Sequence, residues 1–288
     1  MIPDSLRGRR AVITGSSRGF GYAVALAYVR AGAAVMLTAR TESELGEARA
    51  SLLVAQPDAR VEMIACDISL EADVDALARA ARSTLGGTDI LVCNAGIYGP
   101  KGPIESIDYA AWAQAIAINL NGVVLSVRAF AEQLKAAQRG KVIILSGGGA
   151  TKPMPNLSAY AASKAAVVRF GETLAEEWRR HGIDVNSVAP GALNTRLLDE
   201  VIAAGPGAVG EAFYAASLEQ QERGGAPLER GAALCVYLGS RASDDITAKL
   251  ISAIWDPWER FDDLREPLAT TDVLTLRRIV PEDRGMTW

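Results

Sequence analysis

Short apolar runs alternate with helical patterns from residue 10 to about residue 254. The runs have the length of buried strands, and the stretches between them repeat apolar residues at intervals of three and four, as helices do. Strands are expected at Ala11–Thr14, Ala34–Thr38, Val61–Cys66, Ile90–Cys93, Val142–Leu145, Ile183–Val188 and Leu250–Ile254. Helices are expected at Gly21–Ala31, Glu71–Leu85, Trp112–Ala137, Tyr160–Arg180 and Glu229–Leu238. This alternation predicts an α/β fold, a doubly wound and mostly parallel seven-stranded sheet with helices on both faces.

Two segments interrupt the alternation. Residues 197–228 hold several glycines around short helical pieces, and we expect them to form a mobile substrate lobe. Residues 256–288 follow the last expected strand and are too apolar for plain disorder. We therefore expect one domain over residues 1–255 and a C-terminal extension that packs on this domain or on a neighbouring subunit.

The composition excludes several classes of function. A net charge of −4 without a basic stripe argues against a nucleic-acid partner. Three scattered cysteines and a single histidine provide neither metal-ligand spacing nor a disulfide framework. The N-terminus lacks an apolar signal core, and no uninterrupted apolar run approaches about 18 residues. We expect a cytoplasmic protein with a small-molecule substrate, no metal and no membrane partner.

A glycine-rich turn, Thr14–Gly21, follows the first expected strand and opens the first expected helix. Its glycines at positions 15, 19 and 21 permit a tight turn and a close backbone approach to a pyrophosphate. The helix N-terminus adds unpaired N–H groups and a partial positive charge. The turn therefore predicts a dinucleotide site.

The end of the second strand indicates which dinucleotide binds. An acidic side chain that accepts from the ribose hydroxyls is usual there. This chain instead has Ala39 followed by Arg40, and Arg18 lies in the glycine turn. Two guanidinium groups without a carboxylate favour a 2′-phosphate, so we predict NADP(H) rather than NAD(H). The alternative is that Arg40 is a solvated surface charge.

Two further strand ends carry candidate cofactor contacts. Asp67 follows the third strand, where its carboxylate is placed to accept from an adenine amino group; alternatively, it caps a helix that starts near Ser69. Asn94-Ala95-Gly96 follows the fourth strand and lets backbone approach the cofactor, unless it is simply a tight turn.

Tyr160 and Lys164 stand four residues apart in an expected helix, so both side chains project from one face. Free tyrosine titrates near pH ~10, and a neighbouring cation lowers that pKa. The pair is therefore a candidate proton donor and acceptor. The alternative is a surface stack of an aromatic ring on an aliphatic stem.

Together these motifs resemble the short-chain dehydrogenase/reductase family. The matches, in the order and spacing of the family, are Thr14-Gly-x3-Gly-x-Gly21, Asp67, Cys93-Asn-Ala-Gly96, Asn119, Tyr160-x3-Lys164 and Pro190-Gly-x3-Thr195. The resemblance covers roughly residues 8–254 and implies a Rossmann-type domain, hydride transfer at a carbinol or carbonyl carbon, and a homodimer or homotetramer. The cofactor contacts that it implies are Gly15, Ser17, Arg18, Gly19, Phe20, Gly21, Arg40, Asp67, Ile68, Asn94, Ala95, Gly96, Tyr160, Lys164, Pro190, Gly191, Leu193 and Thr195.

The resemblance also assigns roles. Tyr160 is implied as the general acid/base, and Lys164 as the residue that binds the nicotinamide ribose and lowers the pKa of Tyr160. Asn119 is implied to hold a helix kink and a water in a proton relay. The Pro190–Thr195 segment is implied to contact the nicotinamide carboxamide.

One family feature is displaced in this chain. The family places a serine after the fifth strand to hold the substrate oxygen, and the spacing from Tyr160 puts that place at Gly147. Ser146 lies one residue earlier, and a shift of one residue along a strand turns a side chain to the other face. We include Ser146 as a candidate catalytic residue, reached through a bulge in the glycine run. Otherwise a water or a backbone N–H takes the role, or the gap admits a bulkier substrate.

The end of the domain departs from the family as well. The usual turn after the last strand is replaced by Trp255-Asp-Pro-Trp258, at an edge where the family often forms a subunit contact. These tryptophans either pack the tail or wall the substrate pocket.

Three functions follow. The leading hypothesis is an NADP(H)-dependent oxidoreductase acting on a carbonyl or secondary alcohol of a polar small molecule. The second is an epimerase that oxidises and re-reduces one carbon with a retained cofactor. The third is a non-catalytic nucleotide-binding scaffold, which the presence of Tyr160, Lys164 and Asn119 disfavours.

Overall fold

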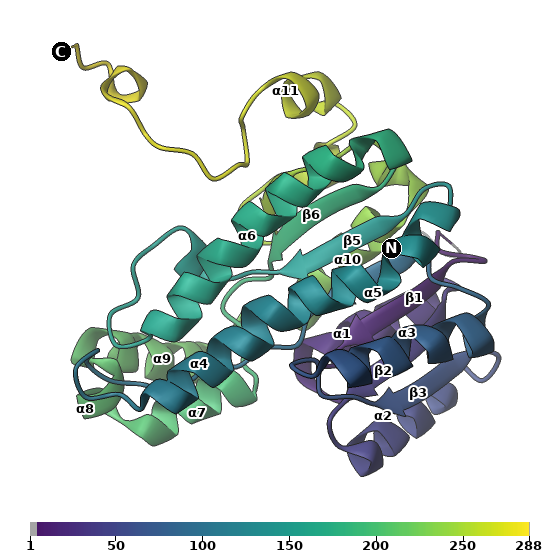
Figure 1. The fold of residues 1–288 in the computed structure, drawn as a ribbon. Coiled ribbons are helices and arrows are strands. Elements are labelled where there is room, and N and C mark those ends of the chain that lie inside the picture. The colour runs from purple at the N-terminus through teal and green to yellow at the C-terminus, as the bar shows by residue number, and fades with distance from the viewer. Residues whose placement is uncertain (1–4, 288) are drawn as a thin grey trace.

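The computed structural model describes residues 5–287, and these contain one seven-stranded sheet (Figure 1). The strands are β1 Arg10–Thr14, β2 Ala34–Ala39, β3 Val61–Ala65, β4 Ile90–Cys93, β5 Lys141–Leu145, β6 Asp184–Ala189 and β7 Lys249–Ser252. Every neighbouring pair is parallel, in the order β3-β2-β1-β4-β5-β6-β7. The predicted fold class and the seven predicted strands are confirmed.

The strand order places the site. The chain runs outward from β1 to β3, then returns to β4 beside β1 and runs outward to β7. In such a doubly wound sheet, ligands bind where the order reverses, in the crevice outside the carboxyl ends of the strands. The reversal lies between β1 and β4, whose carboxyl ends are Thr14 and Cys93.

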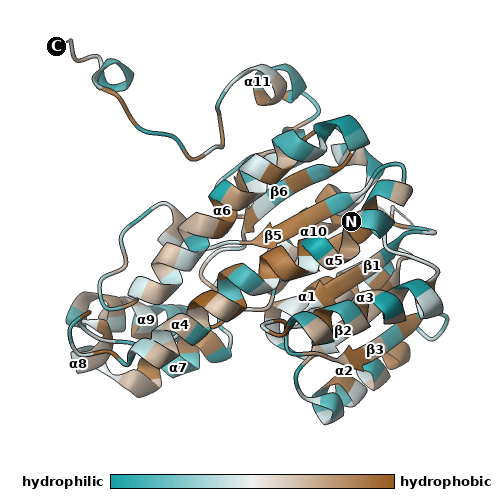
Figure 2. Ribbon diagram, in the orientation of Figure 1, coloured by the Kyte–Doolittle hydropathy of each residue, from teal (hydrophilic) through white to brown (hydrophobic). Residues whose placement is uncertain are grey.

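Helices cover both faces of the sheet because each strand buries alternate side chains on opposite sides. In β1, Ala11 and Ile13 join one core cluster and Val12 joins the other. The first cluster is completed by α1 Gly19–Arg30, α2 Glu42–Ala55 and α10 Leu228–Gly239, and the second by α3 Glu71–Leu85, α5 Gly122–Ala136 and α6 Ser158–Trp178. Figure 2 shows the strands as the most hydrophobic part of the ribbon.

The helix expected over Trp112–Ala137 is not continuous. It consists of α4 Tyr109–Ile116, a π-helical turn over Ala117–Asn121 and then α5. Within the combined Tyr109–Ala136 stretch, an 18-residue window has a mean hydropathy of 1.4, so by length and composition alone this is a helix that could cross a membrane. The core helix of a globular domain meets the same criterion, and Phe130 and Leu134 are fully buried against the sheet.

Residues 197–228 form part of a helical lobe. Its helices are α7 Arg196–Ala204, α8 Pro206–Val209 and α9 Glu211–Arg223, and Figure 1 shows them grouped beside α4, at the carboxyl ends of β5 and β6. Across the base of the lobe, the Gln220 side-chain amide donates to Asn194 Oδ1, and the Asn194 side-chain amide donates to the Gln220 main-chain carbonyl. The lobe therefore lies on the side where the crevice opens; its mobility stays a prediction.

The C-terminal extension packs on its own domain as far as residue 276. Trp258, Phe261 and, in α11 Arg265–Thr270, Leu268 are buried in the first core cluster. Beyond them, the N–H of Leu276 donates to Glu172 Oε1 on α6 at 2.7 Å. The last residues of the described chain extend away from the sheet (Figure 1).

At the opposite end of the sheet from the crevice, a buried ion cluster joins β5 to β6. The Lys141 ammonium is 1% exposed and lies 2.6 Å from Asp184 Oδ2 and 2.8 Å from Asp244 Oδ1. It also donates to Ser243 Oγ. Burial raises the pKa of Asp184, while Lys141 acts in the opposite direction. Because the ammonium is paired with two carboxylates, the cluster links the amino ends of β5 and β6.

Candidate active site

The glycine turn has the geometry of a pyrophosphate cradle. Gly15 has φ of +65°, and a Cβ there would lie 2.9 Å from Ala95 Cα. A Cβ on Gly21 would collide with the Gly15 carbonyl oxygen. The N-terminus of α1 at Gly19 has no side-chain cap and no acidic residue in its first turn. Its N–H groups and positive dipole end are therefore open to an anion, so the residues present fit the predicted dinucleotide.

Asn94 fastens this turn to the end of β4. Its side-chain amide donates to the carbonyl oxygens of Thr14 at 2.9 Å and Gly15 at 3.0 Å. The backbone N–H groups of Asn94 and Ala95 both donate to Thr14 Oγ1. The Gly96 backbone packs closely against Asn119, because a Cβ on Gly96 would lie 3.2 Å from Asn119 Oδ1.

The ribose end of the crevice contains a carboxylate that sequence reasoning missed. Arg18 Nη1 lies 2.8 Å from Glu44 Oε1, and Ser17 Oγ donates to Glu44 Oε2 at 3.2 Å. Arg40 follows β2 and is exposed. Glu44 lies four residues beyond Arg40, in the acidic first turn of α2, and that turn was the only local signal for it.

Asp67 and Ile68 follow β3 as expected. Asp67 Oδ1 accepts from the Ser69 backbone at 2.9 Å and from the Ser69 hydroxyl at 2.6 Å. The helix begins at Glu71 rather than near Ser69, so the alternative capping role is wrong. Ile68 is buried and packs against α5, where a Cβ on Gly122 would lie 2.7 Å from its Cδ1.

The segment after β6 folds back over the glycine turn. Gly191 has φ of +103°, and Thr195 precedes the first residue of α7. A Cβ on Gly19 would lie 3.7 Å from Thr195 Cγ2, so the end of this segment and the glycine turn are neighbours. The remaining predicted contacts are less open: Leu193 is partly buried against the first core cluster, and the Phe20 side chain is buried, packing under Gly231. Phe20 therefore offers the crevice its backbone.

Asn119 lies inside the π-helical turn and is 1% exposed. Its Oδ1 accepts from the Ile97 N–H at 2.9 Å, and its Nδ2 donates to the Ile97 carbonyl at 2.8 Å. Nδ2 also donates to Ser163 Oγ at 3.0 Å, and that hydroxyl donates to the Tyr160 carbonyl. A π-helical turn stands where the kink was predicted, and Asn119 ties the loop after β4 to α6.

Lys164 is buried on the same helix turn as Tyr160. Its Nζ donates to the Leu145 carbonyl at 2.8 Å and lies 5.6 Å from the centre of the Tyr160 ring. Burial lowers the pKa of Lys164 to about 8. A charged Lys164 is therefore costly at this buried position.

The expected lowering of the Tyr160 pKa is not found. Burial, followed by the neighbouring Tyr98, raises the pKa of Tyr160 above its ordinary value. The physical reason is that the phenol is packed under the Tyr98 ring, with centroids 4.5 Å apart. In this state Tyr160 is a protonated phenol, which is the form that donates a proton.

Gly147, not Ser146, faces the phenol. A Cβ on Gly147 would lie 2.7 Å from the Tyr160 hydroxyl oxygen. Ser146 is 5% exposed, its N–H donates to the Val188 carbonyl, and its hydroxyl has no hydrogen-bond partner among the described residues. The described contacts thus give Ser146 no link to Tyr160. Nearby Cys93 is a buried thiol whose pKa burial raises to about 12, so it is not a poised nucleophile.

Tyr98 and Lys101, in the loop after β4, were not singled out from the sequence. Lys101 Nζ lies 5.8 Å from the centre of the Tyr98 ring and 3.8 Å from Glu200 Oε2 on α7. The loop after β4 therefore contacts both Tyr160 and the helical lobe. These contacts join segments about 60 and 100 residues apart, so no local sequence pattern predicts them.

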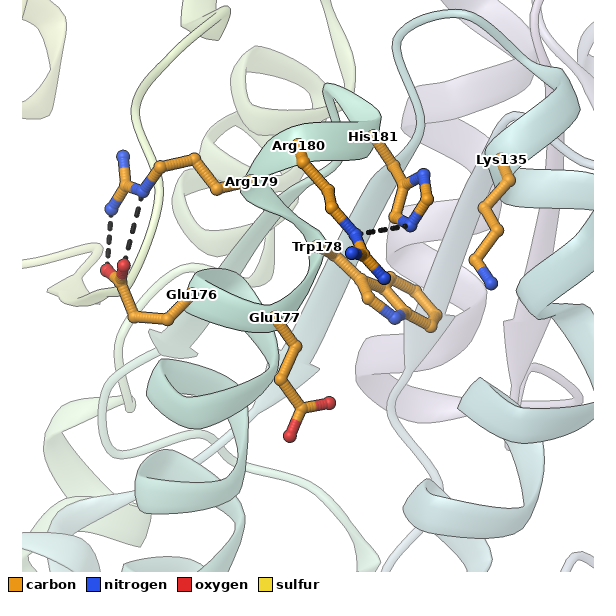
Figure 3. A pocket seen from close by; sticks show the side chains of 7 residues that line it. All are labelled: Lys135, Glu176, Glu177, Trp178, Arg179, Arg180 and His181. Atoms are coloured by element: carbon orange, nitrogen blue, oxygen red, sulfur yellow. Dashed lines mark hydrogen bonds and ion pairs between the residues drawn. The ribbon is translucent and has the colours of Figure 1, made fainter.

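A separate surface hollow of about 780 Å³ lies at the far end of α6 (Figure 3). It is lined by Lys135, Glu176, Glu177, Trp178, Arg179, Arg180 and His181. Its position next to the start of β6 puts it at the amino ends of the strands, away from the crevice. The predicted site residues do not line it.

Comparison with known proteins supports the site. A model of the short chain dehydrogenase family matches residues 9–204. A glucose 1-dehydrogenase of Gluconobacter oxydans is 37% identical over 193 residues, which are 67% of this chain and 72% of the relative.

Solved structures agree. The crystal structure of a levodione reductase superposes with a TM-score of 0.78 at 29% identity, covering 88% of this chain and 96% of the other. An NADPH-bound short chain oxidoreductase of Pseudomonas aeruginosa PAO1, described as containing an atypical catalytic center, gives 0.75 at 28% identity, covering 86% and 97%. With its seven-stranded parallel sheet and its family-matched region of residues 9–204, the chain belongs to the short-chain dehydrogenase/reductase family of oxidoreductases.

Proposed function

We propose that this protein is an NADP(H)-dependent oxidoreductase that interconverts a carbonyl and a secondary alcohol on a polar small molecule, with Tyr160 as the general acid/base. The observation that carries the proposal is the juxtaposition of Tyr160, Lys164 and Asn119 at the carboxyl ends of β4 and β5, beside the glycine turn. A bound nicotinamide supplies or accepts the hydride.

The residues of the chain manage the proton. In the direction of reduction, Tyr160 gives its phenolic proton to the carbonyl oxygen as the carbonyl carbon gains hydride, and the product is a secondary alcohol. In oxidation, the phenolate takes that proton back. Lys164, whose Nζ lies 5.6 Å from the centre of the Tyr160 ring, is proposed to bind the nicotinamide ribose beside the phenol. Asn119 holds the helix turn and the loop on which these groups depend.

The preference for NADP(H) is supported by Arg40 and by the absence of a carboxylate at Ala39. Glu44 opposes it, because its carboxylate pairs with Arg18 and adds negative charge near the ribose end. A 2′-phosphate that displaces Glu44 from Arg18 gains two guanidinium partners, and this exchange favours the phosphorylated cofactor.

The substrate is proposed to be polar, in line with the names of similar proteins, glucose 1-dehydrogenase and levodione reductase. Within this chain, Lys101 and Asn156 supply polar groups beside the lobe: Lys101 pairs with Glu200, and a Cβ on Gly210 would lie 3.3 Å from Asn156 Nδ2. We propose a cytoplasmic location and a homo-oligomer.

We propose that the subunits of the oligomer do not pair through the outer edge of β7. The outward N–H of Leu250 donates to the Leu274 carbonyl, and that of Ser252 donates to Asp256 Oδ2, both at 2.7 Å. The C-terminal extension thus occupies the edge that another strand would need.

The test is a screen of sugars, polyols and cyclic ketones that follows NADPH absorbance in both directions, with NADH in parallel. We expect substrate-dependent NADPH oxidation or NADP reduction. Epimerised product without net change in NADPH would favour the epimerase instead. Tight cofactor binding without conversion of any compound would favour the non-catalytic scaffold.

A further inference from the structure

Tyr98 and Gly147 both lie against Tyr160. Position 147 has no side chain, and Ser146 has no contact with Tyr160 among the described residues. Tyr98 is the aromatic residue packed against Tyr160, with centroids 4.5 Å apart and planes tilted by 54°. A second phenol therefore lies next to the reacting one.

The backbone on either side of Tyr98 is fixed. The N–H and carbonyl of Ile97 are both held by the Asn119 side chain, at 2.9 and 2.8 Å. On the other side, Gly99 has φ of +74°, and a Cβ there would lie 2.7 Å from Ala115 Cβ and 3.4 Å from Ala159 Cβ. Gly99 is thus wedged between α4 and α6. Fixed neighbours of this kind are what hold a functional side chain in place.

The Tyr98 side chain is oriented and kept protonated. Lys101 lies 5.8 Å from the centre of its ring and pairs with Glu200. Burial, followed by the negative charge of Glu200, raises the pKa of Tyr98 above its ordinary value. Among residues 5–287, neither Tyr98 nor Tyr160 makes a hydrogen bond through its hydroxyl. Both hydroxyls therefore keep an unused hydrogen-bond donor.

We infer that Tyr98 is a further catalytic residue, whose hydroxyl donates a hydrogen bond to the substrate oxygen in place of the serine absent at position 147. The inference rests on the proposed function. The proton that Tyr98 shares stays on Tyr98, and Tyr160 remains the group that transfers its proton. A donor aimed at an oxygen that gains negative charge stabilises the transition state.

The experiment compares Tyr98→Phe, which removes only the hydroxyl, with Tyr109→Phe as a matched control. Tyr109 is 77% exposed and stacks on Trp112 at the start of α4. We expect Tyr98→Phe to lower kcat by about 10²-fold with little change in NADPH affinity, since loss of one such donor costs about 10²–10³-fold. Tyr109→Phe should match the wild type.

A rescue variant separates chemistry from packing. In Tyr98→Phe/Gly147→Ser, the new serine supplies a hydroxyl at position 147, and its Cβ requires the same small shift of the Tyr160 hydroxyl as the Cβ of Gly147→Ala. We expect at least about tenfold recovery of kcat over Tyr98→Phe alone, as one charge-assisted hydrogen bond is worth about 1.5–3 kcal/mol. Because this gain needs a hydroxyl, Tyr98→Phe/Gly147→Ala should show none.

The outcomes are distinct. A wild-type kcat for Tyr98→Phe overturns the inference and leaves the proposed function standing. Equal kcat for the serine and alanine double variants reduces Tyr98 to a packing role and also overturns it. Unchanged NADPH binding, measured by fluorescence, checks that each variant is folded. A wild-type protein without turnover on any carbonyl or alcohol overturns the proposed function itself.

Discussion

At the scale of single residues, the position of Tyr160 in the active site depends on Gly147 having no side chain. Gly147 leaves a space that the Tyr160 hydroxyl fills, since a Cβ would lie 2.7 Å from that oxygen. The neighbouring Gly148 is different, because a Cβ there meets no atom within 4 Å. The two adjacent glycines therefore provide a variant and its own control.

Gly147→Val should displace the Tyr160 phenol and lower kcat by about 10²-fold, the usual cost of misplacing a reacting group by about 1 Å. Gly148→Ala should keep wild-type kcat. Steady-state kinetics at saturating NADPH measures both. Equal rates for the two variants would mean that Tyr160 does not need the space at position 147.

The cofactor choice is also decided by single residues. Arg40→Ala should weaken NADPH at least about tenfold more than NADH, because a charge-assisted hydrogen bond to phosphate is worth about 1.5–3 kcal/mol. Glu44→Gln should have the opposite effect, since it releases Arg18 from the 2.8 Å ion pair. Fluorescence titration with both cofactors measures these constants. Equal losses for NADPH and NADH in Arg40→Ala would remove the case for a 2′-phosphate.

At the scale of elements, the site requires α6 to bury Lys164, and this burial disfavours the charged ammonium. The Lys164 ammonium is buried on α6 and donates a hydrogen bond to the Leu145 carbonyl. Its pKa is lowered to about 8 in the fold against 10.5 ordinarily. The unfolded chain therefore holds this proton more tightly than the folded chain. Burial of Lys164 lowers the free energy of unfolding by its full amount below about pH 8, and this loss of stability disappears as the pH rises through 10.5.

Lys164→Met keeps the aliphatic stem and removes the charge. We expect the variant to be inactive but, without cofactor, more stable than the wild type at pH 7 by up to about 3 kcal/mol, at about 1.4 kcal/mol per pKa unit. The difference should shrink between pH 8 and pH 10.5. Urea unfolding across this range measures it, and a variant less stable at every pH would contradict the assigned burial cost.

The elements also show which features the sequence could predict. All seven strands were predictable because short apolar runs between helical patterns identify buried parallel strands. The break in Trp112–Ala137 was not, since the π-helical turn is held by contacts of Asn119 with Ile97 and Ser163, far away in the chain. Glu44 and Tyr98 escaped notice for the same reason. Their importance comes from Arg18 and Tyr160, which only the folded chain brings near.

At the scale of the whole molecule, the C-terminal extension closes the sheet. The outward N–H groups of β7 are satisfied by Leu274 and Asp256, and Lys249 Nζ donates to the carbonyls of Thr271 and Val273. An open parallel edge would instead be a template for another chain. The extension thus covers the edge at which another chain would otherwise add a strand.

A chain ending at Thr271 should self-associate more strongly than the full chain, because it loses the Leu274 carbonyl that caps β7 yet keeps the buried Trp258, Phe261 and Leu268. A chain ending at Arg278 keeps the cap and should behave as the full protein. Light scattering after size-exclusion chromatography compares the three. The same mass for all of them would show that the extension does not control assembly.

The account rests on Tyr160 as the group that exchanges a proton with the substrate. The direct measurement is the turnover of Tyr160→Phe at saturating NADPH, on the first compound that the wild type converts, with NADPH affinity measured on the same sample. We predict a loss of about 10²–10⁴-fold in kcat, typical of a removed general acid/base, with cofactor affinity within about twofold of the wild type. Wild-type turnover by a folded, cofactor-bound Tyr160→Phe would contradict the account.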